Sequence, residues 1–477
     1  KIQSCFTGIQ RGLVWLPSSV ELAAAPYADF AREVLSPWQT DAFQNGAATA
    51  RWLCASKSRP LAFGTGASCG LLLACQGRRR CHRRGRLRRW ILHAKSIFEV
   101  SSLADRQGVE VFSRMSSCGN GCVVVMKHDA SEVSLPCCSG AADDSETEEW
   151  RVLQFVGDSA RGVCTQSITR VFAARSAGQL RACARTLALG YTRACVSVAL
   201  SAGHALGSPL LEAAASPRAL VIGLGAGSMP LWLGAQLPSR LRCDVVELDP
   251  TVVAAAMGAL GFPRHVVRDC QGALAAAADL FINDSDRLAV YLCDGAEFVA
   301  ELAAIASSDF GYDLVIVDAF DQFGAIPAAL CTEPFFSHLK ALLRPSGAVA
   351  LNLLASTETS DDKAGIVGGF SDALGGDTFS VCTPPPETGN MVFGFTRCHV
   401  PRGVGESLQE ALRRSGCAID AAAAAHFSIA DCLDVDFLEV PPQVSENVFR
   451  SCASDESSAD NDWWSLGVGS TRHRLLT

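Results

Sequence analysis

The chain has 477 residues, of which 49% are hydrophobic, and a formal net charge of -8. This acidic balance excludes a general nucleic-acid binder, which concentrates basic residues. The length allows one large catalytic core with accessory segments. The 21 cysteines are scattered and form no paired CxxC motifs. We therefore interpret them as small buried side chains in a reducing compartment and expect no metal site.

Residues 1–95 lack the pattern of a folded catalytic unit. Segment 61–75 is apolar, but its 15 residues are fewer than the roughly 20 that a membrane-spanning helix needs. The arginine-rich run 78–89 follows almost directly. Such a run is typical of an organelle-targeting remnant, which would make the protein organellar rather than cytoplasmic. A disordered basic linker, a mispredicted exon and a nuclear-localisation or RNA-contacting patch are the alternatives.

Short β-type segments come next, separated by turn-forming or acidic stretches. They are residues 109–115, 121–127, 150–156 and 167–173. We expect them to form a small antiparallel β unit over residues 96–180. A helix over residues 182–205, which carries Tyr191, is expected to follow.

Residues 219–250 have the order strand, glycine loop, helix, strand. Gly223, Gly225 and Gly227 follow the apolar run and let the backbone turn tightly and approach a ligand closely. The helix is expected to begin near Pro230. The pattern predicts a nucleoside-binding unit.

The spacing of the glycines indicates which nucleoside. A dinucleotide loop reads GxGxxG, whereas here the glycines fall as GxGxG and Ser228 occupies the third-glycine position. This favours a ligand without a pyrophosphate, such as S-adenosylmethionine, and disfavours a dinucleotide oxidoreductase. A plain strand-to-helix turn is the alternative for such a loop, so the acidic strand ends downstream carry much of the argument.

The rest of the chain predicts an α/β domain over residues 181–440. Alternation of strands and helices predicts a mostly parallel sheet of the class I methyltransferase (Rossmann-like) type, with a closing antiparallel hairpin. Strands are expected at 244–248, 288–292, 312–317, 348–353, 378–381 and 391–396. Helices are expected at 252–260, 296–306, 335–343 and 407–430, with a turn at 344–347. Residues 263–286 are interpreted as an insertion with a helical alanine run, and residues 441–477 as a disordered tail.

Four acidic residues stand at or just beyond strand ends, where ligands bind in open parallel sheets. We expect Glu247 to accept the ribose hydroxyls and Asp294, with Gly295, to lie at the adenine. Asp318 and Asp321 are expected near the transferred group, where a carboxylate can accept the proton of an attacking amine. Capping of the following turns or helices is the alternative role for each.

Several motifs of the chain resemble one family. They are GLGAGSMPLWL, VVELDPTVV, LCDGAEFV, YDLVIVDAFDQFG and TEPFFSHLKALLRPSGAVALNLL, with VLQFVGDSARGVCTQS and YTRACVSVAL upstream. Together they resemble the spermidine-synthase-like branch of class I S-adenosylmethionine-dependent methyltransferases. Within it, the chain is similar to the C-terminal domain of the elongation factor 1-alpha lysine and N-terminal methyltransferases.

The resemblance implies roles for individual residues. It places Gln166 and Tyr191 near the donor or acceptor, and the three glycines along the tail of the donor. It implies Asp318 as base, with Asp321 and Tyr191 beside it. It also implies a homodimer and a protein or small-amine acceptor. From the acidic charge we expect no nucleic-acid partner, and from the shortness of segment 61–75 no stable membrane span.

Three departures from spermidine synthases affect the predicted reaction. Their glycine loop carries an aspartate that pairs with the amine of decarboxylated S-adenosylmethionine, and this chain has Ala226 there. Their DSSDP acceptor loop is replaced by DAFDQ, and Thr192 stands where they have glutamine. A zwitterionic donor tail needs no acidic loop. We therefore favour methyl transfer to an amine such as a protein lysine; a spermidine- or spermine-forming aminopropyltransferase and a noncatalytic scaffold remain as alternatives.

Overall fold

The structure is a computed structural model that describes residues 99–133, 146–157, 163–174, 179–264, 267–269, 287–321, 323–354, 360–383, 390–423 and 425–440. These all fall within one compact unit, residues 83–477. The basic run 78–89, the alanine run after residue 270 and the tail 441–477 lie outside the described residues. Within the described ranges, no helix is both long and apolar enough to cross a membrane.

The first sheet is antiparallel and contains strands β1 to β5 in chain order. Its strands are β1 (Val109–Met115), β2 (Cys122–Asp129), β3 (Glu146–Val156), β4 (Val163–Ala174) and β5 (Leu180–Ala182). Short 3-10 turns, Ser102–Asp105 and Ala130–Glu132, flank its first strands. The predicted small antiparallel unit is therefore observed, with longer second, third and fourth strands and one further strand.

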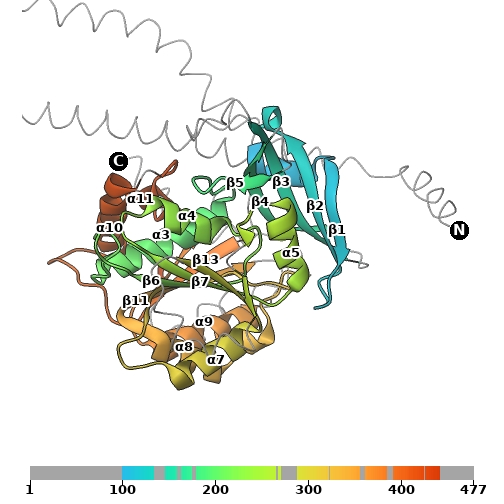
Figure 1. Cartoon of the computed structure of the whole chain (residues 1–477). Helices are drawn as coiled ribbons and strands as arrows, with labels where there is room; N and C mark the ends of the chain where they lie inside the picture. The colour runs from blue at the N-terminus through green and yellow to red at the C-terminus, as the bar shows by residue number, and fades with distance from the viewer. Residues whose placement is uncertain are drawn as a thin grey trace, which may run out of the picture. The chain divides into compact units, whose positions relative to one another are not determined.

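The second sheet has nine strands in the order β14-β12-β13-β11-β10-β6-β7-β9-β8 (Figure 1). Its strands are β6 (Arg218–Ile222), β7 (Arg242–Glu247), β8 (Val267–Asp269), β9 (Leu288–Leu292), β10 (Tyr312–Val317), β11 (Leu343–Leu354), β12 (Thr378–Cys382), β13 (Asn390–Thr396) and β14 (Leu438–Val440). Strands β6 to β11 pair in parallel, whereas β12, β13 and β14 add antiparallel pairs. The expected fold, a mostly parallel methyltransferase-type sheet with a closing antiparallel hairpin, is confirmed.

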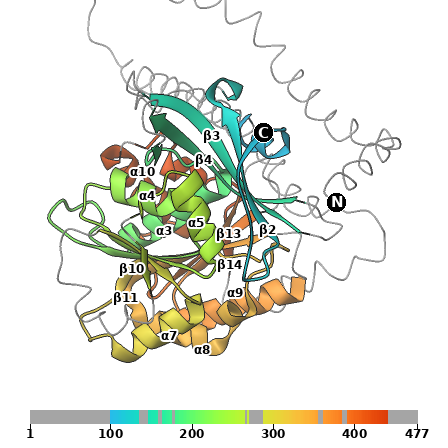
Figure 2. The same cartoon turned by 45° about the vertical axis from the view of Figure 1, so that its right-hand side comes forward.

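Helices cover both faces of the large sheet, and the two views agree on which (Figures 1 and 2). One face carries α3 (Gly190–Ala205), α4 (Ser228–Gln236), α5 (Pro250–Ala259), α10 (Leu408–Ala422) and α11 (Ile429–Cys432). The other carries α7 (Gly295–Ile305), α8 (Glu333–Leu342) and α9 (Ser360–Leu374). A further 3-10 turn, Ala328–Cys331, precedes α8.

The central strand β10 shows why the sequence adopts this layering. All six of its residues are buried. Leu314 and Ile316 pack in the core below α3, and Val315 and Val317 pack in the core against α8. A continuous apolar run is what a parallel strand buried on both faces requires. The strand therefore holds its carboxyl end, and Asp318 after it, in a fixed position.

Several expected boundaries were wrong. The helix predicted from residue 182 begins at Gly190, because Leu180–Ala182 pairs with β4 as an edge strand. The single helix expected over residues 407–430 is two helices, α10 and α11. The carboxylate of Asp420 accepts hydrogen bonds from the backbone N–H of Ile429 and Ala430, and so fixes the break.

Other parts of the large sheet were not anticipated. Segment 267–269, interpreted as part of an insertion, forms β8 and pairs in parallel with β9. The expected turn 344–347 lies within β11, as a bulge between the pairs Tyr312–Leu343 and Leu314–Ala348. The helix α9 was missed. The helix α4 begins at Ser228, two residues before the expected start, because Gly227 caps it in the left-handed conformation.

Candidate active site at the carboxyl ends of the parallel strands

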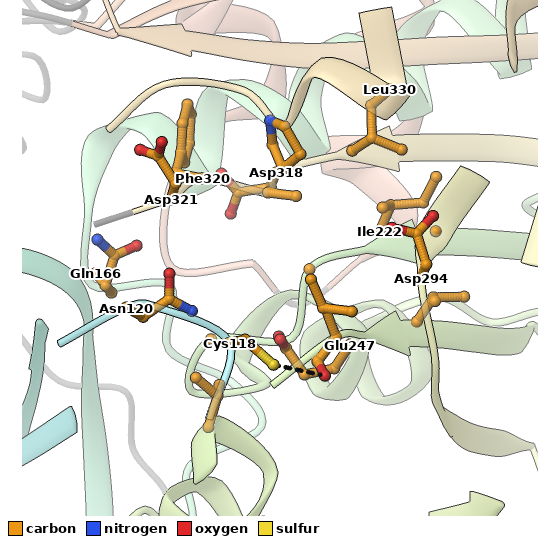
Figure 3. Close-up of a pocket in the computed structure, with 18 of the residues that line it drawn as sticks. Cys118, Asn120, Gln166, Ile222, Glu247, Asp294, Asp318, Phe320, Asp321 and Leu330 are labelled. Carbon is orange, nitrogen blue, oxygen red and sulfur yellow. Dashed lines mark hydrogen bonds between the residues drawn. The ribbon is translucent and has the colours of Figure 1, made fainter. Parts of the chain in front are cut away.

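A cavity of about 270 Å³ opens where β6, β7, β9 and β10 end (Figure 3). Most of the residues expected at the site line it, from four strand ends and from β4 and α3. They are Gln166, Tyr191, Gly223, Gly225, Glu247, Asp294, Gly295, Asp318 and Asp321. Gly227 is not among the lining residues. The four carboxylates that the sequence places at or just beyond the ends of three strands thus share one cavity.

The glycine loop after β6 is required by its own packing. Gly223, Gly225 and Gly227 have φ values of +97°, +51° and +73°, which disfavour side chains other than hydrogen. A Cβ on Gly223 would overlap the carbonyl oxygen of Asp318, and one on Gly227 would overlap the ring of Phe262. Gly223 therefore lets the loop pack against the backbone of Asp318 at the edge of the cavity, whereas Gly227 packs the start of α4 against Phe262.

Glu247 is held by two backbone N–H groups. Its Oε2 accepts from Leu224 at 2.9 Å and its Oε1 accepts from Asp249 at 2.9 Å. Burial raises the pKa of this carboxyl, and the two hydrogen bonds act against the rise. Each oxygen retains a further lone pair for a ligand hydroxyl, so the geometry suits the ribose role expected from the sequence.

Asp294 caps the helix that follows it. Its Oδ1 accepts from the backbone N–H groups of Ala296 at 2.7 Å and Glu297 at 3.1 Å. The capping role that was the alternative reading is thus present. Its Oδ2 has no hydrogen-bond partner among the described residues and remains available at the cavity. Gly295 beside it lies tightly against Ile222, where an added Cβ would come within 2.8 Å.

Asp318 differs because, within the described ranges, no backbone N–H caps its carboxylate. Its Oδ1 accepts from Nδ2 of Asn352 at 2.9 Å, and Oδ1 of Asn352 accepts from Nδ2 of Asn390 at 3.0 Å. This polar chain crosses β10, β11 and β13. Burial raises the pKa of the Asp318 carboxyl to about 6, and the Asn352 hydrogen bond opposes the rise. A carboxylate of this pKa can accept a proton near neutral pH.

Asp321 both lines the cavity and shapes its rim. Its Oδ1 accepts from the backbone N–H groups of Phe323 at 2.8 Å and Ala325 at 2.9 Å. The loop 321–325 is therefore closed by the same carboxylate that was expected to face the acceptor. Figure 3 shows Asp321 beside Phe320 and on the same side of the cavity as Gln166.

β4 and α3 also contribute to the cavity wall. The Tyr191 hydroxyl donates to the backbone oxygen of Gln166 at 2.8 Å. Ser167 accepts the backbone N–H of Ala226 at 3.3 Å, and a Cβ on Gly225 would lie 2.6 Å from its hydroxyl. This hydroxyl therefore fixes the tip of the glycine loop against β4.

Some lining residues escaped the sequence analysis. Asn120 and Cys118 come from the turn between β1 and β2, which the sequence marks only as a generic turn. Phe155 and Phe320 supply apolar walls. Asn352 does not line the cavity but donates to Asp318, which does. In the sequence it is marked only as one amide within the apolar strand β11. Long-range placement of this kind has no local sequence pattern.

The cysteines and the charge of the site are also informative. Among the described residues, no group of His, Cys, Asp or Glu could hold a metal ion. The interpretation of all the cysteines as small buried side chains in a reducing compartment was wrong, because Cys293, which lines the cavity, is disulfide-bonded and Cys118, Cys398 and Cys417 are exposed. The described lining includes Glu247, Asp294, Asp318 and Asp321 but no lysine, arginine or histidine. The cavity is therefore suited to a cationic ligand.

Comparison with known proteins gives the family context. Residues 206–360 match the family described as Spermine/spermidine synthase domain. The human eEF1A lysine and N-terminal methyltransferase is 29% identical over 140 residues, which cover 28% of this chain and 17% of that protein. The polyamine aminopropyltransferase of Vibrio vulnificus is 28% identical over 176 residues, covering 37% of this chain and 48% of that protein.

A solved structure of human methyltransferase-like protein 13 in complex with SAH is 23% identical, with a TM-score of 0.37, and covers 49% of this chain and 91% of that one. The matching part of this chain spans about a sixth of the length of the human eEF1A lysine and N-terminal methyltransferase. Over residues 206–360 the chain is similar to the spermine/spermidine synthase domain and related in sequence to eEF1A lysine and N-terminal methyltransferases, which confirms the resemblance stated from the sequence.

Proposed function

We propose that the protein is an S-adenosylmethionine-dependent methyltransferase that acts on an amine, such as a lysine or N-terminal amine of a protein. The observation that carries this proposal is the cavity of four carboxylates without a basic side chain among its described lining residues. Both reactants would be cations, because the donor contains a sulfonium and a free amine is protonated at neutral pH. Such a cavity attracts both.

The residues fit the donor at three points. Gly223 and Gly225 bring backbone without side chains to the cavity for the tail of the donor, Glu247 offers lone pairs to a ribose, and Oδ2 of Asp294 is available to the exocyclic amine of adenine. When bound, S-adenosylmethionine supplies a methyl group that its sulfonium already activates. Catalysis by the protein then consists mainly of holding the two reactants in line.

Asp318 is the proposed base. The ammonium group of the acceptor gives a proton to Asp318, and the nitrogen lone pair then forms a bond to the methyl carbon while the carbon–sulfur bond breaks. The products are the methylated amine and S-adenosylhomocysteine. The pKa of about 6 leaves Asp318 largely ionised at pH 7 but still able to take a proton. Asp321 and Phe320 lie on the acceptor side of the same cavity.

Ala226 supports methyl rather than aminopropyl transfer. It is buried in the glycine loop, and its backbone N–H donates to Ser167. No carboxylate is provided by the loop for the lone ammonium of a decarboxylated donor, whereas an intact donor carries its own carboxylate. The similarity to proteins named as eEF1A lysine and N-terminal methyltransferases supports the same choice.

Aminopropyl transfer is the second candidate. The similarity to the Vibrio vulnificus polyamine aminopropyltransferase and the presence of two aspartates, Asp318 and Asp321, favour it. The two reactions differ in the group that reaches the acceptor. We also propose that residues 181–440 form the donor-binding domain and residues 96–180 its companion β unit.

The test is a product assay with the full-length chain. Incubation with methyl-labelled S-adenosylmethionine and a panel of lysine- and N-terminal-amine peptides should label a peptide, read by mass spectrometry. A parallel incubation with decarboxylated S-adenosylmethionine and putrescine should give no spermidine. Formation of spermidine without peptide methylation would replace the proposal with the second candidate.

A further inference from the structure

The turn between β1 and β2 reaches the donor cavity from the other sheet. Its residues 116–120, here called the hairpin tip, place Cys118 and Asn120 in the cavity lining. Figure 3 shows Cys118 beside Glu247, and Asn120 between Gln166 and Cys118. The sulfur of Cys118 lies 3.5 Å from the backbone oxygen of Leu248, at the end of β7. The five-stranded sheet therefore contacts the same strand end that holds the proposed ribose carboxylate.

A buried carboxylate holds the hairpin tip in place. Asp249 is fully buried, and its Oδ2 accepts from the hydroxyl of Ser116 at 2.5 Å and from Nδ2 of Asn120 at 3.1 Å. Its Oδ1 accepts from the backbone N–H of Thr251 at 2.8 Å and so also caps α5. One side chain thus joins the end of β7, the start of α5 and the hairpin tip.

Ser116 organises the tip from within. While its hydroxyl donates to Asp249, its oxygen accepts from the backbone N–H groups of Cys118 at 3.0 Å and Asn120 at 3.2 Å. The backbone N–H of Ser116 also donates to the oxygen of Gly121 at 2.8 Å. The position of Asn120 is therefore set by Asp249 both directly and through Ser116.

The orientation of the Asn120 amide follows from its partner. The NH₂ group of Asn120 donates to Asp249 and therefore faces away from the cavity-side oxygen of the same amide. Its Oδ1 is then the polar atom left for the cavity, and it needs an N–H or O–H donor on the ligand. The proposed donor has two such groups near Glu247 and the glycine loop, namely the ribose hydroxyls and the ammonium of the amino-acid tail.

We propose that the hairpin tip is a wall of the donor site, that Asn120 contacts the donor by accepting a hydrogen bond from its hydroxyl or ammonium group, and that Asp249 is the positioning residue. This rests on the proposed function. It makes the five-stranded sheet a part of the donor site, and it assigns donor affinity to Asn120, which lies outside the region that matches the spermine/spermidine synthase domain.

The test measures binding of S-adenosylhomocysteine and 5′-methylthioadenosine to the full-length chain by calorimetry. Asn120→Ala should weaken S-adenosylhomocysteine binding roughly 3- to 30-fold. Asp249→Asn keeps a side chain that can cap α5 but can no longer accept from both Ser116 and Asn120, and it should lose a similar factor. Ser117→Ala is the matched control within the tip, because Ser117 does not line the cavity, and it should bind as the wild type does.

The two ligands locate the contact. An equal loss for both, in Asn120→Ala, places the contact at the ribose, and a loss confined to S-adenosylhomocysteine places it at the amino-acid tail; either result supports the proposal. Unchanged affinity for both ligands in Asn120→Ala overturns it, while intact wild-type binding leaves the proposed function standing. Absence of wild-type binding, in a folded sample, overturns the proposed function and this inference with it.

A second readout needs no variant. Cys118 is exposed at the cavity and Cys417 is exposed on α10. Saturating S-adenosylhomocysteine should slow alkylation of Cys118 by N-ethylmaleimide, measured by peptide mass spectrometry, and leave Cys417 unaffected. Equal rates for Cys118 with and without the ligand would contradict a tip that borders the donor.

Discussion

The two walls of the cavity are built in different ways. The wall from the nine-stranded sheet is acidic, and each of its carboxylates is held by hydrogen bonds from the backbone or from Asn352. The wall from the five-stranded sheet and α3 is uncharged. Its Asn120 is held by Asp249 from the other sheet, its Tyr191 by the backbone oxygen of Gln166, and the side chain of Gln166 by the nearby sulfur of Cys164. Charged groups stand where rigid parallel strands end, and neutral groups stand on a hairpin and a helix.

Charged and neutral lining residues need different support from the fold. Carboxylates near one another repel, so they need the donors that strand ends and helix starts provide. Neutral amides have no such requirement and can be supplied by a turn that is docked through one buried carboxylate, Asp249. We therefore expect changes to the acidic wall to have larger effects than changes to the neutral wall.

The largest effect is expected for Asp318→Asn. Loss of the proposed base should lower the turnover rate about 10²- to 10⁴-fold, while donor affinity measured by calorimetry stays near the wild-type value. Asp309→Asn, an exposed residue just before the same strand, is the control and should keep full activity. Loss of donor binding in Asp318→Asn would contradict the assignment as base.

Glu247→Ala should come next. Removing a carboxylate that accepts two hydroxyl hydrogen bonds should weaken binding of S-adenosylmethionine on the order of 100-fold, since hydrogen bonds to charged groups contribute about 1.5–3 kcal/mol each. Calorimetry measures the change. Glu301→Ala, which truncates an exposed acid on α7, should bind normally. Equal affinity of the Glu247 variant and the wild type would remove the ribose role.

A third change tests whether packing against Phe262 requires a glycine at position 227. Gly227→Ala places a Cβ against Phe262 at a φ of +73° and should lower the free energy of unfolding by roughly 1–3 kcal/mol. Gly234→Ala lies in the same helix, where an added Cβ meets nothing within 4 Å, and should raise it by about 0.5–1 kcal/mol. Denaturant unfolding measures both. Equal effects would show that the loop is not constrained by Phe262.

The smallest effect is a shift in pH dependence. Turnover should rise with pH through about 6, because Asp318 must be ionised to accept a proton. The Asn352 hydrogen bond lowers the pKa of Asp318, so Asn352→Leu should move this acid limb to higher pH, by about one unit or less. Asn390→Ala, one step further along the chain of amides, should move it less. A shift to lower pH in Asn352→Leu would contradict the account.

The parts that the sequence predicted are those with local signals. The bounds of β9 and β10 were correct because each is an apolar run closed by an acid, and GxGxG marked the loop after β6. The shared cavity of Glu247, Asp294, Asp318 and Asp321 followed from the rule that parallel strands end at one edge.

The rest depended on contacts between distant segments. Asn120 enters the cavity because Asp249, more than a hundred residues later, accepts its amide. Asn352 lies within an apolar strand, and its role became visible only because it donates to Asp318 at the end of the neighbouring strand. The break between α10 and α11 depends on Asp420 reaching forward to Ile429. None of these pairings leaves a periodic or motif-like pattern in the chain.

The most direct measurement is a pair of calorimetric titrations of the full-length chain, with intact and with decarboxylated S-adenosylmethionine. The account predicts that the intact donor binds more tightly, because the glycine loop with Ala226 offers no carboxylate to a lone ammonium. Tighter binding of the decarboxylated donor would contradict the central claim and make the protein an aminopropyltransferase.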